Sequence, residues 1–341
     1  MKVMHLLQSN RFSGAENVVC QIISLFQSDD NIEMTYVCPD GPIRTELEKR
    51  NISHVLMPSF SQKEIVKVAK TLKPDYIHAH DFNASIRASM IHGPKIIAHL
   101  HSNPLWLSKL CPQSIVFTLR AYKFKRVIGV SSSILDEFIF HGLIEKKYTI
   151  IHNVIDVNRL ALLAKEEMIQ GFDLLFVGRL SEAKDPLYFL NIIKALHKRD
   201  PSLKAVMIGV GPLEEDCRSF INDNDLSQHV TMLGFQRNPY KYMNAAKIIV
   251  VTSKYEGFGL VAVEAMSLRK LVIARPVGAL KDILDDDCGI TCSSQEEFCD
   301  SILEYIGNSN QREILGKSAY VRALEYADIN GFKEKIRNAY I

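Results

Sequence analysis

Two glutamates and two glycines lie close together in the segment YEGFGLVAVEAM, residues 255–266. Glu256 comes just before a predicted helix, and Glu264 lies inside that helix eight positions later. Gly257 and Gly259 leave backbone amides unobstructed at the helix N-terminus, where unpaired N–H groups and the helix dipole favour an anion. One carboxylate is therefore predicted beside a phosphate-sized anion site, and the other about two turns along the helix. This arrangement suits a sugar nucleotide.

Two cations occur in the segment GRLSEAKDP, residues 178–186, which begins with Gly178 directly after an apolar run. Arg179 and Lys184 are placed to reach one pyrophosphate. A guanidinium forks onto phosphate oxygens and an ammonium acts as a compact charge, so together they can neutralise a diphosphate leaving group. A basic pair in a polar loop is otherwise a solvated surface feature; the position after a strand favours the phosphate role.

The segment GVGP, residues 209–212, also lies between a predicted strand and a predicted helix. Gly209 and Gly211 resemble the start of a dinucleotide fingerprint, but Glu214 stands where its third glycine would be. We expect a tight turn beside a nucleotide site more than an NAD site.

Short apolar runs alternate with amphipathic segments in both halves of the chain, which predicts doubly wound parallel sheets. Ligands bind beyond the carboxyl ends of the strands in such sheets, where the motifs fall. In the second half we predict strands at 173–177, 204–208, 230–233 and 248–251, and helices at 187–197, 213–221, 240–245 and 260–267.

This alternation also divides the chain into domains. We predict an N-terminal Rossmann-like domain at 1–156, a linker at 157–171, a C-terminal Rossmann-like domain at 172–325, and a tail at 326–341 that crosses back to the N-terminal domain.

The composition is that of an ordinary folded protein, with 47% hydrophobic and 23% charged residues. A net charge of +2 argues against a dedicated nucleic-acid binder. Seven cysteines without a CxxC pair predict buried thiols in a reducing compartment. The N-terminus has no signal-peptide pattern, and no apolar run approaches the roughly 20 residues of a membrane span. We therefore expect a cytoplasmic protein, with contact to the inner face of the cell membrane left open.

The motifs GRLSEAKDP, GVGP and EGFGLVAVEAM are accompanied by IHNVID at 151–156 and SGAE at 13–16. Together they resemble the family 4 retaining glycosyltransferases, also called glycosyltransferase group 1, over nearly the whole chain. The resemblance implies a GT-B fold, an α/β architecture of two doubly wound Rossmann-like domains that face a central cleft.

By the same resemblance, the protein moves a sugar from a nucleotide diphosphate sugar, expected to be a UDP-sugar, to a hydroxyl. The acceptor would be a glycan or a lipid-linked molecule in bacterial cell-surface polysaccharide synthesis. The resemblance implies no metal or other cofactor, and no nucleic-acid partner.

The resemblance also implies roles for individual residues. Glu264 would hold the ribose of the donor, and Glu256 the donor sugar. The implied catalytic residues are Glu256, His101, Arg179 and Lys184. The implied donor-binding residues are Gly14, Gly178, Arg179, Lys184, Gly209, Gly211, Phe258, Gly259, Leu260 and Glu264.

Four histidines form two same-face pairs at predicted strand ends, His78 with His80 and His99 with His101. Imidazoles are common zinc ligands, so a zinc cluster is one interpretation. Packing and hydrogen bonding at strand ends is the other. The resemblance requires no metal and places a histidine at the position of His101 near the donor sugar, so we predict no metal site.

The segment 105–126 mixes aromatic, aliphatic and basic residues. Such a segment can lie at a membrane interface and meet a lipid-linked acceptor. An amphipathic helix packed on its own sheet is the alternative, and Pro112 interrupts any single long helix.

Three other functions fit parts of the pattern. A nucleotide-sugar epimerase of similar architecture would need no acceptor, and a non-catalytic nucleotide-sugar-binding subunit would show no turnover. A Rossmann dehydrogenase lacks its third glycine here.

Overall fold

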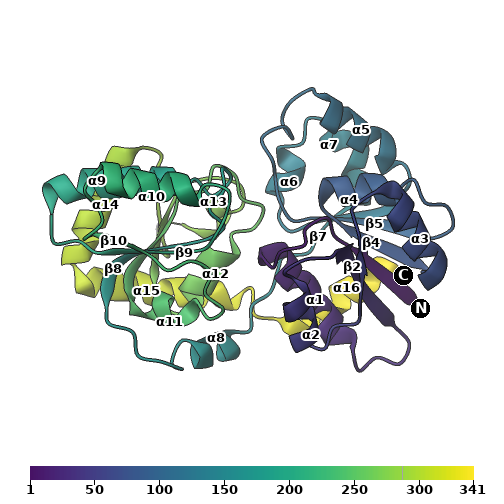
Figure 1. The fold of residues 1–341 in the computed structure, drawn as a ribbon, viewed down its shortest axis with the longest axis horizontal. Helices are drawn as coiled ribbons and strands as arrows, with labels where there is room; N and C mark the ends of the chain where they lie inside the picture. Colours follow the sequence, from purple (N-terminus) through teal and green to yellow (C-terminus); the bar gives the residue numbers. More distant parts are fainter. Residues whose placement is uncertain (286) are drawn as a thin grey trace. The chain divides into compact units, whose positions relative to one another are not determined.

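The computed structural model describes residues 1–285 and 287–341, which form two compact units. The first unit comprises Met1–Asn153 and Asn330–Ile341, and the second comprises Val154–Ile329. Each unit contains one sheet whose strands all pair in parallel, with helices between successive strands (Figure 1). The predicted α/β class with two parallel sheets is confirmed.

The first unit has a seven-stranded sheet in the order β3-β2-β1-β4-β5-β6-β7. Its strands are β1 (Lys2–Leu6), β2 (Glu33–Pro39), β3 (His54–Met57), β4 (Tyr76–His80), β5 (Lys95–Leu100), β6 (Phe124–Gly129) and β7 (Tyr148–Ile150). Its helices are α1 (Gly14–Phe26), α2 (Arg44–Lys49), α3 (Gln62–Leu72), α4 (Asp81–Ala88), α5 (Pro112–Ala121), α6 (Ser133–Asp136), α7 (His141–Ile144), the short 3-10 helix η1 (Glu145–Lys147) and α16 (Ile329–Tyr340).

The second unit has a six-stranded sheet in the order β10-β9-β8-β11-β12-β13. Its strands are β8 (Phe172–Val177), β9 (Ala205–Ile208), β10 (Val230–Met232), β11 (Ala246–Val251), β12 (Leu271–Ala274) and β13 (Ile290–Thr291). Its helices are α8 (Val157–Leu163), α9 (Pro186–Arg199), α10 (Glu214–Asp223), α11 (Tyr240–Ala245), α12 (Leu260–Ser267), α13 (Leu280–Ile283), α14 (Gln295–Gly307) and α15 (Ser309–Leu324).

Helix α12 has the bounds that its composition predicts. Ala262, Val263, Ala265 and Met266 are all buried, and the helix contacts α15, α8 and strands β11 and β12. A helix with apolar residues on most of its circumference is stable only when neighbours surround it. Glu264 interrupts this apolar run and is therefore held between buried neighbours.

The structure divides the chain at different positions from the predicted domain bounds. The expected linker, 157–171, contains α8, whose N-cap Asp156 accepts a hydrogen bond from the Arg159 amide at 3.0 Å. Leu160 is buried, and α8 contacts α11 and α12, so this segment belongs to the second unit. The sequence of the segment did not predict this packing, because one buried leucine is a weak signal for a packed helix.

The C-terminal helix α16 lies with the first unit, beside α1 (Figure 1). Arg337 pairs with Asp29 at 2.8 Å, and its guanidinium stacks on Phe26. The buried Tyr340 reaches β4, where its hydroxyl hydrogen-bonds to His78 Nδ1 at 2.7 Å.

Six of the seven cysteines are buried and Cys111 is partly exposed; all are free thiols. Among the described residues, no helix is long and apolar enough to span a membrane.

Candidate functional site

The strand order of the second sheet reverses between its neighbouring strands β8 and β11. At such a reversal the loops after the two strands lead away from each other, and ligands bind beyond the carboxyl ends there. The loop after β8 carries Arg179 and Lys184, and the loop after β11 carries Glu256 and Gly259. The two motifs therefore lie at one edge of the sheet.

Lys184 and Glu256 form an ion pair through Nζ and Oε2. The Ser253 hydroxyl donates to the same carboxylate oxygen at 3.0 Å. The side chains of Lys184 and Glu256 are 29% and 13% exposed, so both are sheltered but open to a ligand. The structure thus joins the cation expected on phosphate to the carboxylate expected on the sugar.

Residues that follow β11 and β12 hold the loop that carries Lys184. The Thr252 hydroxyl donates to the carbonyls of Lys184 and Asp185, both at 3.0 Å. Arg275 pairs with the Asp185 carboxylate at 2.8 Å and stacks 3.7 Å above the Tyr188 ring. Sequence motifs alone did not indicate Thr252 or Arg275, which fix the backbone of the loop.

Gly209 and Gly211 allow two loops to pack backbone against backbone. A Cβ atom at Gly209, where φ is +139°, would lie 1.9 Å from the Gly178 carbonyl oxygen. A Cβ at Gly211 would lie 2.2 Å from the Leu180 carbonyl oxygen. The Gly178 amide also donates to the Ile208 carbonyl at 3.0 Å. These glycines form a tight turn that supports the Arg179 loop.

Gly259 precedes α12 as its N-cap in a left-handed conformation, with φ of +89°. A Cβ there would lie 2.6 Å from Leu280 Cδ2, so glycine suits both the conformation and the space. Phe258 is buried and packs edge-to-face on Tyr326 at 5.2 Å. The helix start at Leu260 is therefore anchored, with its first amides at the same sheet edge as Lys184.

Glu264 lies on α12 and accepts a hydrogen bond from the Tyr240 hydroxyl at 3.0 Å. Burial raises the pKa of Glu264 to about 7, and the bond from Tyr240 acts in the opposite direction. The carboxyl group therefore holds its proton more tightly than an exposed glutamate does. Sequence reasoning missed Tyr240, which lies in a separate helix, α11.

The remaining predicted residues are less closely grouped. Arg179 is exposed and forms no ion pair with any residue in 1–285 or 287–341. Gly14 and His101 lie in the first unit. Gly14 is the exposed first residue of α1, beside Ser13, whose hydroxyl hydrogen-bonds to Glu16.

The four predicted histidines are joined by a fifth, His5. Strand register places His5 opposite His78 and His80 opposite His99, so the side chains share one face of β1, β4 and β5. His5 contacts His80 at 3.1 Å, and His80 contacts His101 at 2.9 Å. Two three-histidine groups have ligand atoms within 4.8 Å of one another: His5, His78 and His80, and His80, His99 and His101.

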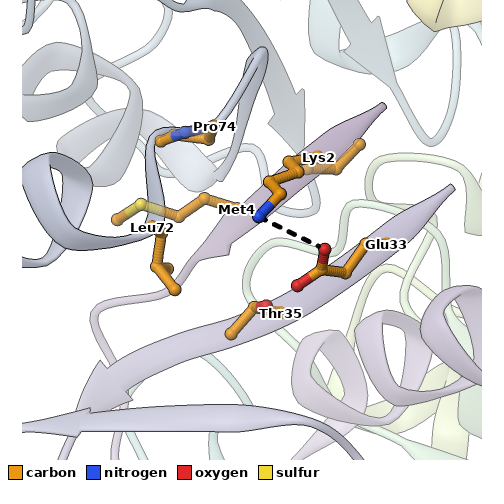
Figure 2. Close-up of a pocket in the computed structure, with 7 residues that line it drawn as sticks. Lys2, Met4, Glu33, Thr35, Leu72 and Pro74 are labelled. Carbon is orange, nitrogen blue, oxygen red and sulfur yellow. Dashed lines mark ion pairs between the residues drawn. The ribbon is translucent and has the colours of Figure 1, made fainter.

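A small pocket lies in the first unit at the amino ends of β1 and β2 (Figure 2). Lys2 and Glu33 form an ion pair across it at 3.5 Å. Its volume of about 10 Å³ is enough for roughly one water molecule. It has no part in the site at the carboxyl ends.

The segment 105–126 contains helix α5. One face of α5 is buried through Ser114, Phe117 and Ala121. Large apolar residues elsewhere in the segment are exposed: Leu105, Leu110, Ile115, Val116, Leu119 and Tyr122. The helix does pack on its own unit, but much of its apolar surface faces outward.

Two family models match the chain, one after the other. Residues 12–159 match the model described as Glycosyltransferase Family 4, and residues 165–322 match Glycosyl transferases group 1. The chain belongs to this glycosyltransferase family. The predicted resemblance and the prediction of a transferase enzyme are confirmed at the level of the family.

Named relatives share moderate identity with the chain. An uncharacterized glycosyltransferase of Methanocaldococcus jannaschii is 27% identical over 62% of this chain and 58% of its own length. The N-acetylgalactosamine-N,N'-diacetylbacillosaminyl-diphospho-undecaprenol 4-alpha-N-acetylgalactosaminyltransferase of Campylobacter jejuni is 30% identical over 45% of this chain and 42% of its own length. The chain thus spans about half the length of these curated relatives.

Solved structures share the fold. HepE from Anabaena, in complex with UDP and glucose, has a TM-score of 0.85 at 21% identity, over 99% of this chain and 98% of that one. TarM has a TM-score of 0.80 at 14% identity, over 99% and 98%. The likeness confirms the GT-B fold.

Proposed function

We propose that this protein is a retaining glycosyltransferase that moves a sugar from a nucleotide diphosphate sugar, a UDP-sugar, to a hydroxyl group. The acceptor is a glycan or a lipid-linked molecule in bacterial cell-surface polysaccharide synthesis. No metal ion or other cofactor takes part.

The ion pair between Lys184 and Glu256, beside the N-terminus of α12, carries this proposal. The cation and the helix amides suit a diphosphate. Glu256 suits the hydroxyls of the attached sugar, and Glu264, further along α12, suits the ribose. One extended donor could use all four features.

In the proposed reaction the bond between the anomeric carbon and the diphosphate oxygen breaks, and its electron pair leaves with the diphosphate. The acceptor oxygen bonds to the anomeric carbon on the same face, and its proton is released. Lys184, Arg179 and the amides of Phe258, Gly259 and Leu260 stabilise the charge that develops on the leaving group. Glu256 positions the sugar and is not a covalent nucleophile.

Relatives support the donor and acceptor classes. HepE was solved with UDP and glucose and with UDP-glucose. The names of the Campylobacter relative and of an Escherichia coli galactosyltransferase, 23% identical over 89% of this chain, both include an undecaprenol diphosphate acceptor. A lipid-linked acceptor would require the protein to meet a membrane surface.

The exposed apolar face of α5 supports such contact. Ile115, Leu119 and Tyr122 repeat at helical spacing, and Lys109 and Lys123, which flank α5 in the sequence, are exposed. Apolar residues with flanking cations favour the interface of an anionic bilayer. We propose weak peripheral binding through 105–126.

A panel of nucleotide diphosphate sugars tests the function in two steps. Thermal shift identifies the donor, since a ligand at 100 times its dissociation constant stabilises the fold by about 2.7 kcal/mol. The identified donor is then incubated with and without acceptors, and the products are analysed by mass spectrometry and NMR. Transfer with an α linkage from an α-linked donor supports the proposal. A changed sugar with donor alone would indicate an epimerase, and binding without turnover a nucleotide-sugar-binding subunit.

A further inference from the structure

Five buried or partly buried histidines of the first unit form two separate hydrogen-bonded chains. One runs from Met34 through His5 and His80 to His101. The other runs from Tyr340 through His78 to His99. In the first chain the neighbouring rings are close to parallel, with interplanar angles of 16° for His5 and His80 and 28° for His80 and His101.

Each ring in the first chain is neutral near pH 7. Burial lowers the pKa of His5 and of His101 to about 3, and lowers that of His80 well below its usual value. A neutral imidazole has one N–H donor and one acceptor nitrogen. Each ring can therefore donate one hydrogen bond and accept one.

Met34 sets the direction of this chain. Its thioether sulfur lies 3.4 Å from His5 Nε2 and carries no proton, so it can only accept. With the proton of His5 on Nε2, His5 Nδ1 must accept from His80 Nε2 at 3.1 Å. The reverse direction would place a nitrogen lone pair against the sulfur.

The same constraint passes to His101. Because His80 donates through Nε2, its Nδ1 accepts from His101 Nε2 at 2.9 Å. The proton of His101 is thus on Nε2, and its Nδ1 is an acceptor. Nδ1 is buried and has no hydrogen-bond partner within the described part of the chain. Asp81 accepts from the His101 amide at 2.8 Å and holds the backbone at this point.

The geometry also argues against a metal in this chain. An imidazole lone pair lies in the plane of its ring, so nearly parallel rings do not aim several lone pairs at one point. The nitrogens shared between His5 and His80, and between His80 and His101, are at hydrogen-bond distance.

We infer that Met34, His5 and His80 are positioning residues that hold His101 in its Nε2–H tautomer, so that Nδ1 accepts a hydrogen bond from a hydroxyl of the sugar substrate. This inference rests on the proposed function. Nδ1 requires a donor, and a sugar hydroxyl is the donor that a glycosyltransferase brings. The Tyr340 chain has no such direction, because a phenol hydroxyl both donates and accepts.

The test measures the tautomer directly in the full-length protein. Long-range ¹⁵N–¹H NMR of histidine-labelled wild-type protein distinguishes the two tautomers, and His101→Ala identifies the His101 signals. We expect the Nε2–H form. An Nδ1–H form in the wild-type protein, or one zinc ion per chain in the purified protein, would overturn the inference.

Met34→Leu removes the acceptor with little change in volume. We expect a mixture of His101 tautomers and a kcat about fivefold lower, the scale of one neutral hydrogen bond, with an unchanged dissociation constant for the bare nucleotide diphosphate. Met57→Leu is the matched control, a buried methionine on β3, and should alter neither readout.

An unchanged tautomer in Met34→Leu would show that the sulfur does not set the direction. A changed tautomer with a normal kcat would show that His101 Nδ1 does not accept a hydrogen bond from a sugar hydroxyl. If no donor or acceptor gives transfer, the proposed function fails and the hydroxyl role fails with it. The wild-type spectrum still decides the tautomer, even if Met34→Leu does not fold.

Discussion

The Lys184 ammonium and the Glu256 carboxylate form an ion pair although 72 positions separate them in the chain. The pair exists because β8 and β11 are neighbours in the sheet, so the loops that follow them begin side by side at one edge. Glu256 holds Lys184 at the sheet edge before a ligand arrives. On the proposed function, a bound diphosphate competes with Glu256 for the same cation, so the two residues should affect binding in opposite senses.

Lys184→Met should weaken binding of the bare nucleotide diphosphate by about 1.5 to 3 kcal/mol, the scale of a hydrogen bond to a charged group. Isothermal titration calorimetry measures this change. The control variant is Lys254→Met. Lys254 is exposed and pairs with Glu182 at 3.5 Å, so this variant should bind the diphosphate normally. Equal affinities for both variants would remove Lys184 from the phosphate site.

Glu256→Gln should lower kcat by about one to three orders of magnitude, or about 1.4 to 4 kcal/mol, because its proposed contact is with the sugar that becomes cationic. The same variant should bind the bare diphosphate as tightly as the wild-type protein or more tightly, because Lys184 is released. Glu182→Gln provides the matched control. Weaker diphosphate binding in Glu256→Gln would contradict the competition described above.

Glu264 should make nucleotide binding pH-dependent. Ribose hydroxyls donate better to an ionised carboxylate, and burial raises the pKa of Glu264 to about 7. Affinity should therefore increase from pH 6 to pH 8 in the wild-type protein, and be weaker and less pH-dependent in Glu264→Gln. Calorimetry at a series of pH values tests this, and parallel profiles for the two proteins would exclude Glu264 as the titrating group.

The same group gives a prediction for stability without ligand. A raised carboxyl pKa means that the native state holds the proton more tightly than the unfolded state. This contribution is complete below the ordinary value of 4.5 and is lost as the pH rises through about 7. At pH 8, Glu264→Gln should be more stable than wild type by about 1 to 3 kcal/mol, and near pH 4 the two should match. Denaturant unfolding at both pH values measures the difference.

Chelation should leave transfer activity intact, because Lys184, Arg179 and the helix amides are proposed to neutralise the diphosphate. The rate is measured before and after EDTA treatment and dialysis. Activity lost with EDTA and restored by Mg²⁺ or Mn²⁺ would replace this account with a metal-assisted one.

Replacing Leu119 and Tyr122 by serine should reduce binding to anionic vesicles at low salt, because Leu119 on α5 is 64% exposed and Tyr122, at the C-cap of α5, is 69% exposed. Vesicle sedimentation measures the bound fraction. Leu162→Ser is the control, since Leu162 is 72% exposed but lies on α8. If wild-type protein shows no preference for anionic over neutral vesicles, the exposed face of α5 does not bind membranes.

Sequence reasoning located the elements whose signals are local. Helix α12 was predicted with its observed bounds, because apolar helix formers and the preceding Gly259 mark its start. The alternation of apolar runs and amphipathic segments likewise predicted two parallel sheets.

The sequence by itself determined which segments form strands and helices, and which residue types follow each strand, because these depend on spacing along the chain. Only the tertiary structure decided which strand ends lie side by side. The order β8 next to β11 joins Lys184 to Glu256, and the register of β1, β4 and β5 joins His5 to the other histidines. Such pairings depend on long-range packing between strands, which the spacing of residues along the chain does not specify.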